Sequence, residues 1–495
     1  MIILISSKIG QADIQASLGK PEYSYFFLMQ EFIPALQQLG SVIEVNSHAE
    51  VDALFEQHRL AGRPVVFLSF SPPHQTPVGL RCPTLSVFAW EFDSLPDEAW
   101  DNDPRNDWRY VFARNGATIT LSQESATTVR AAMGADFPVL AVPAPIWSRF
   151  AGVYPPEGWL PGLSERAFCF TGQVIDSPIL GLSADGLVRK PEPVVAVAEV
   201  PAKRSLSLAE KLHTTRLLWK NWLAEISQSA RPERPETKEP ELPPVEILQP
   251  EPDPAPAEPK REPLAQVLSV QGVVYVSVLN PGDGRKNWVD LITAFCWAFK
   301  EVADATLVVK MTHHDLEYYR VVLMTLLSRL APFKCRVLVL HGYLTDEQYR
   351  ELIRVSDYYV NASACEGLCL PLMEFLSAGK PVLGPVHTAM SDYLNPDLAF
   401  LVQSSPEPSC WSHDPTGKLR TRRYRLNWES LMDAYRSSYR VAKEQPEIYR
   451  AMSQQAFEQM RGYCSTERVA GRLGAFLRQW PGILPPVEAD RSQVQ

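Results

Sequence analysis

Short apolar runs alternate with amphipathic stretches through the first 145 residues of the chain. Between residues 23 and 39, apolar side chains recur at spacings of three and four, a pattern that predicts a helix. Further helices are expected at residues 51–58 and 122–133. The apolar runs predict strands at residues 1–7, 41–45, 65–69, 84–88, 117–121 and 139–142. Apolar strands that alternate with helices predict a parallel sheet with helices on both faces.

The same alternation resumes in the second half of the chain. Thr345 and Gln348 have the spacing of a capping box for a helix that continues to residue 355. Residues 428–480 are expected to be helical, with breaks near Pro446 and Ser465. Strands are expected at residues 273–279, 306–311, 337–340 and 357–360, with a helix at 287–302. The pattern predicts a second α/β domain of the same kind.

An isolated amphipathic helix is expected between the two halves, at residues 205–226. Lys211, Arg216 and Lys220 lie on its other faces. Its apolar stripe consists of Leu208, Leu212, Trp219, Trp222, Leu223 and Ile226. Two interpretations remain open: the helix packs on its own domain, or it lies on an anionic membrane surface.

A proline-rich segment follows that helix. Eleven of the 32 residues from Pro232 to Pro263 are proline, and charged residues separate them. Such a composition cannot bury enough apolar surface to fold, so a disordered linker is expected, or else a docking segment for a partner. The predicted division is residues 1–227, the linker 228–264, a second domain at 265–440, and helices at 441–495 that return to the first domain.

We interpret the loop that follows the strand ending at residue 360 as the stretch around which the chain is organised. The small polar residues 361–363 end the strand, Pro371 suits the start of a helix, and Gly379 ends that helix. A helix N-terminus after such a loop attracts anions such as phosphate. Glu366 and Glu374 flank this position, and carboxylates repel phosphate but accept hydrogen bonds from hydroxyls. A ligand with both groups is a nucleotide sugar.

Composition narrows the classes of function. A length of 495 residues favours two domains, and a net charge of −9 disfavours the broad basic surface of a nucleic-acid-binding protein. The chain has no apolar run long enough to span a bilayer, and its start lacks the features of a signal peptide, so a cytoplasmic protein is expected. The eight cysteines lack metal-ligand spacing and are expected to be reduced thiols.

The loop also resembles a known signature. Glu366 and Glu374, with Gly367, Leu370 and Pro371 between them, are similar to the Glu-x7-Glu motif of retaining GT-B glycosyltransferases of family four. This resemblance implies two Rossmann-like domains that face each other across a cleft, with a proline-rich insertion between them in this chain. It also implies that Glu366 meets hydroxyls of the donor sugar and that Glu374 holds the ribose.

A second stretch carries the same resemblance. Residues 280–286 form a glycine-rich turn with cations that opens a helix, where the family grips the donor diphosphate with an Arg and a Lys. Lys286 falls on the lysine position, and Asn280 stands where Arg is usual, so Arg285 is expected to supply that charge. In the first motif, Leu368 and Cys369 stand where the family usually has Phe and Gly.

The resemblance extends to two later loops. Tyr343 and Leu344 lie in the loop that receives the nucleobase in the family, and Asp392 falls on the acidic residue of a later loop. The catalytic candidates are Glu366, Lys286 and Arg285, and the donor-binding candidates are Glu374, Gly367, Leu368, Cys369, Leu370, Asn280, Lys310, Tyr343 and Leu344.

On the acceptor side, the strand at residues 84–88 ends in an indole and two carboxylates. Trp90, Glu91 and Asp93 either form a wall of the acceptor site, or Trp90 caps the core while both carboxylates are solvated. The family often has a His at a comparable place, and this chain has none there.

The expected reaction is transfer of a sugar from a nucleotide donor to a hydroxyl of a saccharide or glycolipid, with retention, in cell-surface polysaccharide synthesis. No Asp-x-Asp stands at a strand end to hold a metal, so neither a metal nor a cofactor is expected. Association with the inner face of the membrane is a further expectation. The alternatives are a catalytically silent GT-B protein that binds a sugar nucleotide or scaffolds a polysaccharide synthase, and a GT-B phosphorylase or epimerase.

Overall fold

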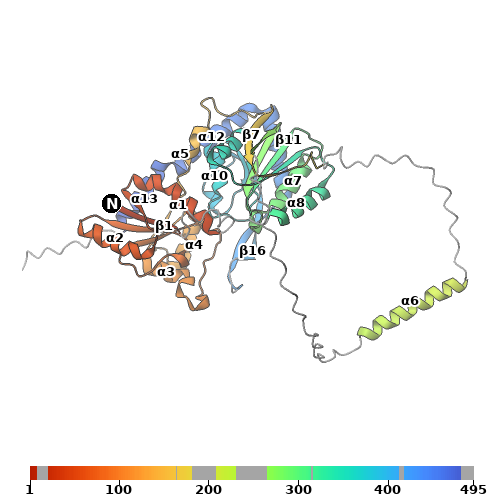
Figure 1. Cartoon of the computed structure of the whole chain (residues 1–495), viewed down its shortest axis with the longest axis horizontal. Helices are drawn as coiled ribbons and strands as arrows, with labels where there is room; N and C mark the ends of the chain where they lie inside the picture. The colour runs from red at the N-terminus through yellow and green to blue at the C-terminus, as the bar shows by residue number, and fades with distance from the viewer. Residues whose placement is uncertain are drawn as a thin grey trace, which may run out of the picture. The chain divides into compact units, whose positions relative to one another are not determined.

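The structure is a computed structural model that describes residues 1–7, 21–162, 164–180, 208–229, 265–313, 316–411 and 417–480. The chain divides into two compact units, of which one joins Met1–Val188 to Pro263–Gln495 and the other is Arg189–Glu262. The predicted linker lies outside the described residues, except for its first two residues, 228 and 229. The first unit contains both predicted α/β domains (Figure 1).

The first domain is built on a six-stranded parallel sheet in the order β2-β1-β3-β4-β5-β6. Its strands are β1 (Ile2–Ser7), β2 (Ser41–Glu44), β3 (Val65–Phe70), β4 (Thr84–Phe88), β5 (Thr118–Thr120) and β6 (Val139–Ala141). The connecting helices include α1 (Pro21–Gln37), α2 (His48–Leu60), α3 (Trp108–Asn115) and α4 (Gln123–Met133). Every residue of β3 and β4 is buried, as expected for strands covered on both faces.

The second domain has a seven-stranded sheet in the order β15-β14-β13-β10-β11-β12-β8. Its parallel strands are β10 (Val273–Leu279), β11 (Ala305–Met311), β12 (Arg336–His341), β13 (Tyr358–Val360), β14 (Val382–Pro385) and β15 (Ala399–Val402). The helices between them are α7 (Trp288–Ala298), α8 (Leu316–Leu330), α9 (Asp346–Val355) and α10 (Leu370–Ser377). The strand order reverses between β10 and β13, and ligands of such sheets bind beyond the carboxyl ends of the strands at this point.

An edge of the second sheet comes from the first half of the chain. β8 (Gln173–Asp176) pairs antiparallel with β12, and β7 (Arg166–Thr171) pairs with β9 (Ala265–Val270). The sequence-based boundary at residue 227 assigned β7 and β8 to the first domain. Arg166 at the start of β7 forms an ion pair of 3.0 Å with Asp357, which is 1% exposed and also accepts a hydrogen bond from the Val274 amide. This buried pair fixes β7 to the base of β13.

The C-terminal helices connect the two domains. They are α11 (Trp428–Glu444), α12 (Pro446–Cys464) and α13 (Thr466–Gln479), with breaks at the positions that the sequence indicated. α13 packs against α1 beside the first sheet (Figure 1). Arg472 in α13 donates to the Ala141 carbonyl at the end of β6, and the Trp147 indole donates to the Phe457 carbonyl of α12. The helices thus return to the first domain.

An antiparallel hairpin in the second domain was not predicted. It consists of β16 (Ser404–Cys410) and β17 (Arg420–Leu426). Pro406, Pro408 and four arginines obscure the apolar alternation by which a strand is recognised, and prolines in strands are restricted to edge positions such as this one. Asp93 of the first domain accepts hydrogen bonds from the Arg422 amide and the Thr421 hydroxyl, so the hairpin is fixed to the loop after β4.

The carboxyl edges of the two sheets face each other. Arg285, which follows β10, forms an ion pair of 3.0 Å with Glu91, which follows β4. A Cβ atom on Gly367, which follows β13, would lie 3.1 Å from Ala89 and from the Trp90 amide nitrogen. A side chain at this position would require Ala89 or the Trp90 backbone to shift by a few tenths of an ångström. Two Rossmann-like domains that meet in this way have the GT-B architecture, and the predicted fold class is confirmed.

The second unit contains α6 (Leu208–Ser229), which matches the helix predicted at residues 205–226. Leu208, Leu212 and Leu223 of its apolar stripe are 79%, 64% and 52% exposed. Within the described part of the chain, no helix is long and apolar enough to cross a membrane.

Candidate functional site

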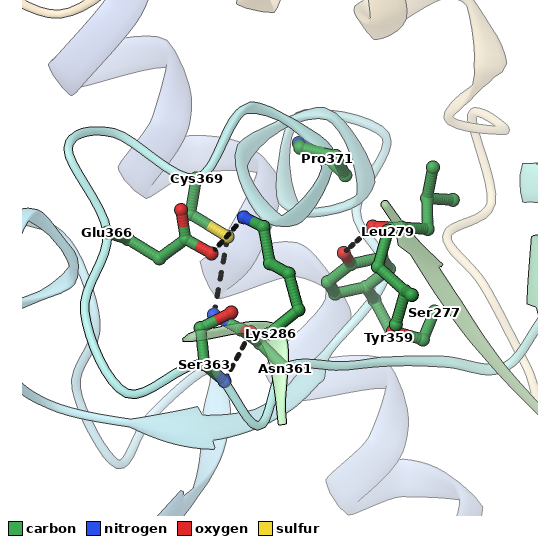
Figure 2. Close-up of a pocket in the computed structure, with 10 residues that line it drawn as sticks. Ser277, Leu279, Lys286, Tyr359, Asn361, Ser363, Glu366, Cys369 and Pro371 are labelled. Atoms are coloured by element: carbon green, nitrogen blue, oxygen red, sulfur yellow. Dashed lines mark hydrogen bonds and ion pairs between the residues drawn. The ribbon is translucent and has the colours of Figure 1, made fainter. Parts of the chain in front are cut away.

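A small cavity lies where the strand order of the second sheet reverses. Its volume is about 10 Å³, enough for about one water molecule. It is lined by Ser277, Val278, Leu279, Lys286, Tyr359, Asn361, Ser363, Glu366, Cys369 and Pro371. Three of the predicted site residues, Lys286, Glu366 and Cys369, therefore lie together at the carboxyl ends of β10 and β13 (Figure 2).

The loop between β13 and α10 is shaped by its polar residues. The Asn361 side chain accepts from the Ser363 amide and donates to the Cys369 sulfur at 3.3 Å. Cys369, the residue before α10, has a φ of 63° in the left-handed region, a conformation that costs a residue other than glycine about 1–2 kcal/mol. This conformation gives a physical reason for the glycine usual at this position. Pro371 is the second residue of α10, one position later than expected.

Glu366 and Lys286 form the central contact of the site. The Glu366 side chain is 5% exposed, and its Oε1 lies 2.6 Å from Lys286 Nζ. Figure 2 shows the two side chains pointing toward one another. Burial alone would raise the pKa of Glu366, but Lys286 and Arg285 hold that pKa below its ordinary value. Glu366 is therefore a carboxylate at neutral pH, and Lys286 is the cation that balances it.

Arg285 lies beside this pair and is shared among three carboxylates. Its nearest partners are Asp283 Oδ2 at 2.7 Å and Glu91 Oε1 at 3.0 Å, with Glu366 Oε2 at 3.8 Å. Asn280 begins the same turn and accepts from the Gly282 amide. The two cations predicted to grip a diphosphate are thus close together and already paired with acidic side chains.

Glu374 lies in a different environment from Glu366. It does not line the cavity, and its Oε2 accepts a hydrogen bond of 2.5 Å from the Tyr349 hydroxyl of α9. The pKa of Glu374 is raised to about 7, mainly by burial, and several neighbouring groups also act on it. Arg149, one of those neighbours, forms an ion pair with Asp346 at 2.7 Å and a second with Glu31. The second glutamate of the motif therefore belongs to a network that joins the two domains.

The ends of β11 and β12 carry a separate polar group. Lys310 in β11 donates to the Thr312 hydroxyl, and burial lowers the pKa of its ammonium to about 8. His341, which ends β12, is 3% exposed, and neither of its ring nitrogens has a hydrogen-bond partner among the described residues. In the following loop, Tyr343 is 55% exposed and Leu344 is buried at 8%. These residues lie on the β11 and β12 side of the site, away from β13.

The three acceptor-side candidates lie in three different environments. Trp90 is 6% exposed in a cluster with Phe92, Trp108 and Trp411, so it belongs to the core. Glu91 instead contacts Arg285 of the donor-side turn. Asp93, as described above, is bound to β17, and its side chain is still 24% exposed.

Two residues that shape the site, Thr388 and His387, were not predicted from the sequence. Thr388 has a φ of 50°, and its hydroxyl accepts a hydrogen bond from the Glu366 amide. His387 beside it is 3% exposed and stacks on Tyr424 of β17 at a centroid distance of 4.4 Å. The sequence could have indicated Thr388, because this residue lies in the loop after β14. It could not have indicated His387, because His387 stacks on a hairpin that was not predicted.

No family model and no curated protein matches the sequence.

Solved structures resemble the chain at low sequence identity. HepE from Anabaena, solved in complex with UDP, is 12% identical, with a TM-score of 0.45 over 97% of this chain and 100% of that one. Sucrose-phosphate synthase from Thermosynechococcus elongatus is 11% identical, with a TM-score of 0.47 over 97% and 98% of the two chains. The pneumococcal O-GlcNAc transferase GtfA is 12% identical, with a TM-score of 0.40. The match covers 86% of this chain and 58% of the length of GtfA. This overlap is loose, so the inference of function depends on the contacts of the site itself.

The raised pKa of Glu374 predicts a dependence of stability on pH. The carboxyl has a pKa of about 7 in the folded chain against an ordinary value of 4.5. Its contribution to stability is full below pH 4.5 and is lost as the pH rises through 7, because the folded chain holds the proton more tightly than the unfolded chain. Glu374→Gln carries no such proton. Its free energy of unfolding, relative to that of the natural protein, should therefore increase as the pH rises from 5 to 8.

The measurement is urea unfolding of both proteins at several pH values. Glu444→Gln, which changes an exposed carboxyl at the end of α11, is the matched control and should give a difference that does not vary with pH. If Glu374→Gln behaves like this control, Glu374 titrates in the folded chain as an exposed carboxyl does.

Proposed function

We propose that this protein transfers a sugar from a nucleotide-sugar donor to a hydroxyl of an acceptor, with retention at the anomeric carbon. One observation carries this proposal: the buried Glu366 contacts the partly exposed Lys286 beside the N-terminus of α10, where the strand order of the second sheet reverses. A helix N-terminus and a cation suit a diphosphate, and a buried carboxylate suits the hydroxyls of the sugar attached to it. Few other ligands carry both groups side by side.

The donor would lie across the carboxyl ends of the second sheet. Its nucleobase would bind near Tyr343 and Leu344, and its diphosphate would meet Lys286 and Arg285. The ribose would bind Glu374, whose second carboxylate oxygen has no hydrogen bond among the described residues. The sugar would then reach Glu366 and the loop after β14. Binding would require the diphosphate to replace carboxylates as the partner of the two cations, because both are already paired.

The reaction that we propose uses these groups on one face of the donor. The bond between the anomeric carbon and the phosphate oxygen breaks, and its electron pair stays on the phosphate. The acceptor oxygen bonds to the anomeric carbon on the same face, and its proton passes to the departing phosphate. Lys286, Arg285 and the amides of α10 would stabilise the charge on that phosphate, as preorganised donors do in other enzymes.

A catalytically silent protein is the second candidate, and a specific observation favours it. The cavity at Glu366 holds about 10 Å³, and each neighbouring cation already contacts a carboxylate. A protein that used the GT-B architecture only as a scaffold for a polysaccharide synthase would need no larger site. Release of nucleotide from any nucleotide sugar excludes this candidate.

The two glutamates should differ in their kinetic effects. Glu374 would contact a part of the donor that does not change during reaction, so Glu374→Ala should mainly raise the KM for the donor. Glu366 would lie beside the ring on which charge develops. Glu366→Ala should therefore lower kcat by about 10²-fold or more, the scale of losing one well-placed electrostatic group. Steady-state kinetics would measure both, with Glu444→Ala as a control. Near-normal kcat in Glu366→Ala would contradict the assigned role.

Transfer should proceed without a divalent metal, because two cations and the helix N-terminus would already face the diphosphate. The measurement is the rate of nucleotide release before and after treatment with EDTA, which should be equal. A rate that EDTA abolishes and that Mg²⁺ or Mn²⁺ restores would show that this inference is wrong.

We also propose that α6 binds the surface of an anionic membrane, where lipid-linked acceptors reside. Its exposed leucines Leu208, Leu212 and Leu223 fall on one stripe at helical spacing. Lys211 flanks this stripe on one side and Arg216 on the other, an arrangement that suits an interfacial helix.

Binding to vesicles of phosphatidylcholine with phosphatidylglycerol should depend on that stripe. Leu212→Glu should abolish sedimentation of the full chain with these vesicles, because it places a charge in the apolar stripe. Leu217→Glu is the matched control, since Leu217 is on the opposite face and is also exposed at 48%, and this variant should still bind. Equal loss in both variants, or no binding of the natural protein, would refute the proposal.

A further inference from the structure

A second cavity lies at the carboxyl edge of the first sheet, where the C-terminal helices cross it. It is lined by Leu121, Gln123, Ala141, Pro143, Asp392, Tyr463 and Arg472. Its volume is about 140 Å³, close to the roughly 150 Å³ of an engineered protein cavity that binds benzene. The cavity therefore has room for one six-membered ring.

The walls of this cavity have the chemistry of a sugar-binding site. Asp392 Oδ2 accepts hydrogen bonds from the Gln123 amide at 2.9 Å and from the Tyr463 hydroxyl at 3.4 Å. Arg472 is held against the wall by its bond to the Ala141 carbonyl, and its other N–H groups have no hydrogen bond within the described part of the chain, so they can donate to a ligand. A separate part of the lining is apolar and consists of Leu121, Ala141 and Pro143. Such a mixed lining suits a ring with hydroxyls at its edge and C–H groups on its face.

The charges of the lining select against an anion. Asp392 and Arg472 contribute one negative and one positive charge, so the lining has no net charge. The N-terminus of α4, which would otherwise attract a phosphate, already has the Asp392 carboxylate on its first amide. A phosphate placed here would meet that carboxylate. The ligand that fits is a neutral one.

The short helix η8 (Thr388–Asp392) connects this second cavity to the part of the chain that carries Glu366. Asp392 ends η8, and the first residue of that helix accepts the hydrogen bond from the Glu366 amide. A 3₁₀ rise of about 2 Å per residue puts Asp392 roughly 8 Å from Thr388. The loop that carries η8 follows β14, on the opposite side of β13 from β11 and β12. The cavity thus lies beyond Glu366, away from Lys310 and Tyr343.

We propose that this cavity binds a ring of a neutral saccharide acceptor, with Asp392 and Arg472 contacting its hydroxyls. The inference rests on the proposed function, because it places the acceptor beyond the sugar end of the donor site. It adds the class of acceptor, a neutral saccharide, and a site built jointly by the first sheet and the C-terminal helices.

The test is binding of free saccharides to the full chain by saturation-transfer NMR. The probes are glucose, galactose, mannose and N-acetylglucosamine, with UDP measured separately as the reporter of the donor site. Gln123→Trp places an indole at an exposed residue of the cavity wall, and Ala131→Trp makes the same addition at an exposed position further along α4. Both positions are exposed, so both variants should fold.

At least one saccharide should give a signal with the natural protein and with Ala131→Trp. Gln123→Trp should reduce that signal by about tenfold, because an indole fills a cavity of this size. Absence of any saccharide signal with the natural protein, or an unchanged signal in Gln123→Trp, would overturn the proposal. The UDP signal should be equal in all three proteins, and its absence from the natural protein would count against the donor site and not against this cavity.

Discussion

The ion pair between Lys286 and Glu366 is the contact on which the candidate site depends. A carboxylate exposed by only 5% is stable as an ion because a cation lies 2.6 Å away, and the loss of Lys286 would remove the nearest partner of a buried charge. The contact joins the turn after β10 to the loop after β13, the two strands between which the order of the sheet reverses. The same pair therefore holds the site together and defines its charge.

This site is also constrained by the first domain. Glu91 contacts Arg285, and Gly367 packs so closely on Ala89 and the Trp90 amide that a Cβ atom there would require one of them to shift. Asp392 accepts from the first amide of α4, and α13 packs on α1. The donor-side loops are thus positioned from both sides, and a ligand that separates Arg285 from Glu91 would alter the contact between the domains.

The sequence predicted the elements whose signal is local. Apolar runs located the parallel strands, the capping box at Thr345 is present, and Gly379 adopts the positive φ that ends α10. Features that depend on distant contacts were not predictable. β8 joins the second sheet from residue 173, and the β16–β17 hairpin has prolines and arginines where a strand usually has apolar residues. The family resemblance assigned both Glu366 and Lys286 to the donor site, but it could not indicate that Tyr349 would bind Glu374.

The most direct test of the account is whether the site binds a nucleotide sugar. Thermal unfolding would be measured against a panel of nucleotide sugars, for the natural protein and for Lys286→Gln. The account predicts that at least one nucleotide sugar stabilises the natural protein, by about 2.7 kcal/mol at 100 times its Kd, and that Lys286→Gln loses most of this effect. Stabilisation by none of them, or equal stabilisation of the variant, would contradict the account.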